Sequence, residues 1–121
     1  MAEHNDFGKK GEDIAAEYLQ KKGYKIIERN WVSGKNEIDI IAKEGNFIVV
    51  VEVKARHSNF AGEPEMAVTL DKQRSLIRAA NAYVRKMNYN EEVRFDIVSI
   101  LIVNGKEQIN HIEDAFYPTL N

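Results

Sequence analysis

The chain of 121 residues contains no cysteine and only two prolines. Without cysteine it has no disulfide and no thiolate metal site. It also lacks an apolar run long enough to span a bilayer, and it has no signal-peptide pattern. These absences predict a cytoplasmic protein with no membrane partner.

Positive charge is also in short supply. The formal net charge is −2 at pH 7, and the isoelectric point is about 5.9. A protein that coats nucleic acid by charge alone would be basic, so any contact with nucleic acid must come from a local basic patch. The remaining composition, 44% hydrophobic and 30% charged, is typical of a globular protein, and the length predicts one domain over residues 1–121.

Hydrophobic periodicity and turn residues predict the order helix, three strands, helix, strand, strand. We expect Asp6 to be the N-cap of the first helix and Gly23 to end it. The order indicates an α/β fold, a mixed sheet flanked by helices, with a right-handed crossover between parallel third and fourth strands. The expected helices cover residues 6–22, 65–70 and 71–88, and the expected strands cover 24–32, 37–43, 46–54, 92–103 and 106–112.

The third strand ends in an unusual way. Residues 47–51 read Phe-Ile-Val-Val-Val, the pattern of a strand buried on both faces. Glu52 and Lys54 follow, and they share one face because side chains alternate along a strand. A carboxylate and an ammonium therefore end a core strand on the same side.

The preceding strand adds Asp39 to that face. A two-residue turn at 44–45 would place Asp39 opposite Val50, whereas a turn at 45–46 would place it opposite Glu52. In either register Asp39, Glu52 and Lys54 lie on one face of the sheet.

Two carboxylates held close together repel each other, and one would take up a proton unless a cation joins them. Mg²⁺ suits such a pair, because it takes oxygen ligands and keeps several waters, and Mn²⁺ is the alternative ion. The ion can activate a water and stabilise charge on a phosphoryl oxygen, and Lys54 can assist either. Asp39, Glu52 and Lys54 thus have the composition of a metal-dependent phosphodiester hydrolysis site.

The spacing of these residues resembles the D-(x)n-E-x-K signature of the restriction-endonuclease-like, or PD-(D/E)xK, nucleases. The whole chain resembles a narrower group, the YraN-type family of uncharacterised bacterial proteins. One departure is Asn36, where the family usually has glycine, and asparagine also tolerates turn conformations. The matching stretches are GKKGEDIAAEYLQKKGYKIIERNW, NEIDIIAKEGNFIVVVEVKAR, AANAYV and RFDIVSI.

The resemblance implies a restriction-endonuclease-like αβββαβ core and a relation to archaeal Holliday junction resolvases. Those enzymes carry a further acid on the first helix, and Glu12 is the matching position and so a candidate third metal ligand. The helical wheel agrees, since Glu12 lies at the edge of the apolar arc, nearest Leu19. Because such resolvases act as dimers, the analogy also suggests a homodimer.

Residues 72–90 supply the local basic patch, with five lysines or arginines and no acid. Arg74, Arg78 and Arg85 align on one side of the expected helix, opposite its apolar face, where they can contact phosphates. Lys72 and Gln73 project on the apolar side at the helix start and resemble the auxiliary position of the nuclease superfamily. Arg56, just past the metal motif, is a further candidate phosphate contact.

Each feature also has a structural interpretation. Glu52 and Lys54 can form a plain salt bridge, and the arginines can be a solvated helix face. Glu37 can support the metal ligands or act as a turn acid, and the role of His57 is open. Arg94 and Asp96 share a strand face and are expected to form a structural ion pair.

Three functions follow from these alternatives. The first is a Mg²⁺- or Mn²⁺-dependent endonuclease acting on DNA, with branched or damaged DNA as candidate substrates. The second is a nuclease fold that binds nucleic acid or protein without cutting. The third is a structural protein whose carboxylates are satisfied by lysines.

Overall fold

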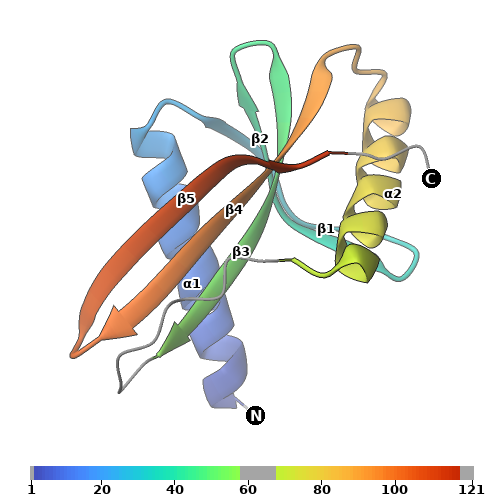
Figure 1. The fold of residues 1–121 in the computed structure, drawn as a ribbon. Helices are drawn as coiled ribbons and strands as arrows, with labels where there is room; N and C mark the ends of the chain where they lie inside the picture. The colour runs from blue at the N-terminus through green and yellow to red at the C-terminus, as the bar shows by residue number, and fades with distance from the viewer. Residues whose placement is uncertain (1, 58–67, 118–121) are drawn as a thin grey trace.

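The computed structural model describes residues 2–57 and 68–117, with side chains from residue 8 onward. The elements follow the predicted order (Figure 1). The helices are α1 (Ala2–Lys21) and α2 (Leu70–Met87), and the strands are β1 (Lys25–Ser33), β2 (Asn36–Glu44), β3 (Phe47–His57), β4 (Glu92–Val103) and β5 (Lys106–Phe116).

The five strands form one mixed sheet in the order β1-β2-β3-β4-β5. Only β3 and β4 run parallel, joined through α2, and the other neighbouring strands are antiparallel. The predicted α/β class and the parallel third and fourth strands are therefore confirmed.

The two helices cover opposite faces of the sheet. On β3, Val49 and Val51 pack in a core cluster with residues of α1, whereas Ile48 and Val50 pack in a second cluster with residues of α2. The alternation of side chains along a fully buried strand produces this division. Glu52 and Lys54 continue the face of Ile48 and Val50, so they emerge on the α2 side.

Helix ends follow local chemistry at most positions. Gly23 ends α1 with a φ of 99°, and Tyr24 N–H donates to the Leu19 carbonyl at 2.9 Å. Thr69 caps α2 by accepting from Lys72 N–H at 3.2 Å.

Three boundary predictions need correction. Asp6 lies inside α1 rather than at its N-cap, because residues 2–5 contain no proline or glycine and continue the helix. The expected short helix over 65–70 falls partly outside the described residues, and Val68 and Thr69 are not helical. The last strand continues to Phe116 rather than stopping at 112.

The extension of β5 is held by a buried polar network on the α1 side. Arg94 Nε and Asp96 Oδ1 are 2.9 Å apart, which confirms the predicted ion pair. His111 Nε2 lies 2.7 Å from Asp96 Oδ2, and Asp114 N–H donates to Asp96 Oδ1 at 3.0 Å. Asp96 thus bonds β5 next to and within the stretch where the register between β4 and β5 is irregular. No helix within the described ranges is long and apolar enough to cross a membrane.

Candidate metal and phosphate site

Asp39 and Glu52 lie where β2 and β3 separate. The pairing of the two strands ends at Ile40 opposite Val51. Beyond that pair, Val53 N–H donates to Asp39 Oδ2 at 2.9 Å, so the carboxylate replaces a backbone acceptor at the fork. Continuing the register brings Asp39 level with Glu52, as a turn at 45–46 requires.

The two carboxylates have unusual electrostatics. Burial and the negative charges of Glu52 and Glu12 raise the pKa of Asp39 to about 7, although the Val53 hydrogen bond and Lys72 oppose the shift. Burial also raises the pKa of Glu52, against the positive charges of Lys72 and Lys54 and a hydrogen bond with Asp39. The pair therefore binds a proton more tightly than exposed carboxylates do, because burial and the neighbouring negative charges outweigh the nearby lysines.

A divalent cation would offset the negative charge of the two carboxylates. An ion bound by Asp39 and Glu52 would replace the bound proton and remove the repulsion between the carboxylates. Mg²⁺ is often held by one or two carboxylates and several waters, and Mn²⁺ prefers similar oxygen ligands. Within residues 8–57 and 68–117, no three acidic or histidine side chains are gathered as a ready metal cluster.

Glu12 faces the pair from α1, where an arginine holds its carboxylate, and its role as a third metal ligand stays a prediction. Its Oε1 lies 3.6 Å from Arg29 Nη2, which also contacts Asp13 Oδ1 at 2.7 Å. Arg29 thus holds the Glu12 carboxylate, which is 18% exposed. The charge of Glu12 still raises the pKa of Asp39, so Glu12 faces the site from α1.

Close packing of α1 sets this approach. A Cβ added at Gly11 would lie only 2.5 Å from Ala55 Cβ on β3, whereas one at Gly8 would meet nothing within 4 Å. Gly11 is therefore packed closely against β3, whereas Gly8 is not. Gly11 therefore allows the residue that follows it, Glu12, to come near the end of β3.

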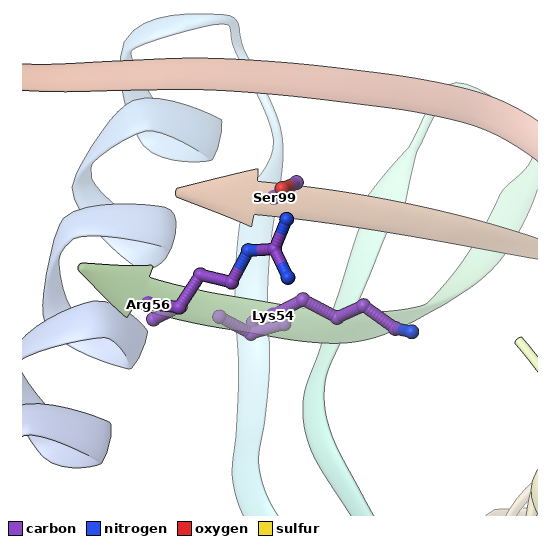
Figure 2. Close-up of a pocket in the computed structure, with 5 residues that line it drawn as sticks. Lys54, Arg56 and Ser99 are labelled. Carbon is purple, nitrogen blue, oxygen red and sulfur yellow. The ribbon is translucent and has the colours of Figure 1, made fainter. Parts of the chain in front are cut away.

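Two lysines face the carboxylates. Lys72 Nζ, at the start of α2, lies 3.9 Å from Glu52 Oε2. The Lys54 side chain extends along β3 away from Arg56, back toward the earlier part of the strand (Figure 2), and its charge lowers the pKa of Glu52. The predicted approach of Lys72 to the site is confirmed.

Comparisons with known proteins identify the family of the chain. Residues 11–100 match the model of "Uncharacterised protein family UPF0102". The chain belongs to this family. UPF0102 proteins of Phocaeicola vulgatus and Flavobacterium psychrophilum are 49% and 50% identical over 120 and 117 residues. Each alignment covers at least 97% of both chains. A relative from Thermodesulfovibrio yellowstonii is 46% identical over 112 residues, covering 93% of this chain and 96% of its own.

These matches confirm the resemblance to the YraN-type family. The matched segment of this UPF0102 protein contains Glu12, Asp39, Glu52, Lys54 and Lys72. The family description names neither an activity nor a metal.

The other predicted binding residues do not gather at the carboxylates. Arg74, Arg78 and Arg85 lie on the exposed side of α2, and their nearest polar partners are local, namely Asp71, Ser75 and the Asn81 carbonyl. Gln73 Nε2 donates to the Val68 carbonyl at 2.9 Å, so it secures the entry to α2 rather than reaching the site.

Four residues near the site had roles that the sequence left open or did not reveal. Exposed Glu37 raises the pKa of Glu52 through its charge. Two contacts, from Val53 N–H to Asp39 and from Arg29 to Glu12, depend on how the strands and the helix pack together. No local sequence motif indicates that packing. Ser99, a buried serine on β4, lines a pocket with Lys54, and its place follows only from the parallel pairing of β3 with β4.

Proposed function

We propose that this UPF0102 protein is a Mg²⁺- or Mn²⁺-dependent endonuclease that hydrolyses phosphodiester bonds in DNA. The observation that carries the proposal is the partly buried pair of Asp39 and Glu52, held together at the fork of β2 and β3, whose pKa values are raised by burial and, for Asp39, by its neighbour's charge. Their arrangement costs free energy without a cation, which is expected of a site built to bind one.

Each residue has a distinct role in this proposal. Asp39 and Glu52 would hold the ion, which supplies a polarised water and neutralises charge on the phosphate. Lys54, on the same strand face, orients the attacking water or stabilises the developing charge. Lys72 offsets charge at Glu52. Glu12, whose charge already reaches Asp39, would complete the metal shell after leaving Arg29.

DNA is the proposed substrate because α2 links the site to a basic surface. Lys72 reaches Glu52 from the start of the helix, and Arg74, Arg78 and Arg85 continue along its exposed side. These arginines can contact backbone phosphates and position the strand. Branched or damaged DNA is the substrate class to test first, and a homodimer would present two sites to a junction.

Cleavage of end-labelled DNA tests the proposal. Single-stranded, duplex, flap and four-way-junction substrates would be incubated with wild type, Glu52→Ala and Glu107→Ala in Mg²⁺, Mn²⁺ or EDTA. Glu107 is an exposed acid on β5 and serves as the matched control. We expect metal-dependent cleavage by wild type and Glu107→Ala only. If no substrate is cut and calorimetry detects no Mn²⁺ binding, the nuclease proposal is wrong.

A second function is favoured by the position of Glu12. Because Arg29 holds this carboxylate, two acids, Asp39 and Glu52, stand ready for a metal among the residues that the structure describes. Two ligands support a weaker site, which is compatible with a module that binds nucleic acid or protein without cutting. DNA binding that is unaffected by metal, together with no cleavage, would favour this alternative.

A further inference from the structure

A shallow pocket lies beside the carboxylates, between β3 and β4. Its lining includes the side chains of Lys54, Arg56 and Ser99, and its volume is about 310 Å³. That is several times the roughly 30 Å³ occupied by one water in the liquid. Figure 2 shows the Arg56 guanidinium turned back along β3 toward Ser99, and the Lys54 side chain extending in the same direction, farther back along the strand.

The lining has the chemistry of a phosphate site. Arg56 offers a planar set of N–H donors, Lys54 offers a point charge, and the Ser99 hydroxyl can donate a further hydrogen bond. Ser99 is only 3% exposed and sits in a β4 stretch that is otherwise hydrophobic, from Ile97 to Ile102. Ser99 therefore places a hydroxyl in a hydrophobic stretch of β4 at the border of a cationic pocket.

The register fixes the position of this pocket relative to the candidate metal site. Ser99 pairs with Lys54 across the parallel β3–β4 ladder. Residues two apart on a strand are separated by roughly 6.6 Å, so Glu52, Lys54 and Arg56 form an evenly spaced row on one face. This spacing is close to that of successive phosphates along a nucleic acid strand.

We propose that Arg56, Ser99 and Lys54 bind the phosphate next to the one held at Asp39 and Glu52. The proposal rests on the proposed nuclease function and deepens it, because it assigns a second phosphate contact that sets the position of the strand. The phosphate is either an internal backbone phosphate or a terminal monophosphate, since both present the same anionic oxygens. Arg56 and Ser99 are then positioning residues, and Lys54 serves both sites.

Binding of short DNA in EDTA tests this subsite without cleavage. The probe is a 3′-labelled thymidine dodecamer, with either a 5′-hydroxyl or a 5′-phosphate, measured by fluorescence anisotropy across a salt series. The variants are Arg56→Ala, Arg56→Lys, Ser99→Ala and Lys25→Ala. Lys25 is an exposed cation at the start of β1, which pairs with Lys43 far from the site-bearing end of β3, and it provides the matched loss of charge.

We expect Arg56→Ala to weaken binding by roughly tenfold and to reduce the slope of log K against log salt by about 0.7, the value for one lost phosphate contact on a single strand. Ser99→Ala should weaken binding by about threefold with no change in slope, because it removes a neutral donor. Arg56→Lys should keep the slope while recovering only part of the affinity. Lys25→Ala should match wild type in both quantities.

The two arms of the probe distinguish the source of the phosphate. A 5′-phosphate that strengthens binding only when Arg56 is present assigns the pocket to a strand end, and equal affinities assign it to an internal phosphate. If Arg56→Ala behaves like Lys25→Ala, or if the dodecamer does not bind at all, the subsite is wrong. Wild-type cleavage together with that result would overturn the subsite alone, whereas an Arg56-dependent slope without cleavage would overturn the nuclease function alone.

Discussion

Asp39→Asn should stabilise the metal-free protein, although it alters the centre of the candidate site. The pKa of the Asp39 carboxyl is raised from an ordinary 3.8 to about 7 in the fold. A carboxyl that binds its proton more tightly when folded loses stability as pH rises from its unfolded to its folded pKa. The penalty is therefore absent below pH 4 and fully developed above pH 7.

The magnitude follows from the size of the shift. One pKa unit corresponds to about 1.4 kcal/mol, so ionised Asp39 costs up to about 4 kcal/mol at pH 8 and under about 1 kcal/mol at pH 4. Asparagine cannot ionise, and its carbonyl can still accept from Val53 N–H. At roughly 4 °C per kcal/mol for a domain of this size, Asp39→Asn should raise the melting temperature by 5 °C or more at pH 8 in EDTA.

Thermal unfolding followed by circular dichroism measures this effect. Glu107→Gln, an exposed carboxamide substitution on β5, should change stability by less than about 0.5 kcal/mol. Mg²⁺ or Mn²⁺ should raise the melting temperature of wild type and Glu107→Gln, since an ion bound only by the folded state stabilises it, and it should not raise that of Asp39→Asn. A loss of stability in Asp39→Asn in EDTA would refute the reasoning, because it would mean that lysines satisfy the carboxylate.

Three further predictions concern packing, the buried network and the second lysine. Gly11→Ala should lower the melting temperature despite alanine's higher helix propensity, because its Cβ would lie 2.5 Å from Ala55 Cβ. Adding Ala55→Gly to that variant should restore the melting temperature. Gly8→Ala, whose Cβ meets nothing within 4 Å, should raise the melting temperature of wild type. Burial opposes ionisation of Asp96, but hydrogen bonds from His111 and Arg94 outweigh it and lower its pKa. Asp96 therefore contributes stability above pH 4 that is lost in more acidic solution. In urea titrations Asp96→Asn should unfold more easily than wild type at pH 7, and its stability should fall less steeply as the pH is lowered. Lys72→Ala should slow cleavage while strengthening Mn²⁺ binding measured by calorimetry, since it removes a cation 3.9 Å from Glu52; weaker Mn²⁺ binding would contradict the proposed role.

The carboxylate face was predictable because it depends only on the two-residue period of a strand. Asp39, Glu52 and Lys54 share that face in either hairpin register, so the ambiguity of the turn did not matter to the prediction. The register itself is decided by the turn at 45–46, where Gly45 adopts a φ of 58° that favours glycine. A period of two is a strong signal, whereas a one-residue choice of turn is a weak one.

The ends of helices and strands were less predictable, because the local signals that set them are also weak. An N-cap contributes only about 1 kcal/mol, so Asp6 could be overridden by a preceding segment able to continue the helix. The end of β5 depends on Asp114, which has a φ of 55° and whose N–H is bound by Asp96 from the neighbouring strand. Such tertiary hydrogen bonds carry a strand through residues that by themselves favour a turn.

The division between direct ligands and charges acting at a distance could not be predicted from residue types. Glu12 was placed on the correct side of α1 by its helical position, and its charge does reach Asp39. Whether Glu12 can bind an ion depends on two contacts away from its own position in the sequence pattern. The Gly11–Ala55 contact sets the distance between α1 and the sheet, and Arg29 of β1 competes for the Glu12 carboxylate. Arg29 brings a positive charge to Glu12 and so offsets part of the repulsion that this third acid adds to Asp39 and Glu52 in the absence of metal. Release of Glu12 from Arg29 would then accompany metal binding, so Arg29→Ala should destabilise the metal-free protein more than the metal-bound one.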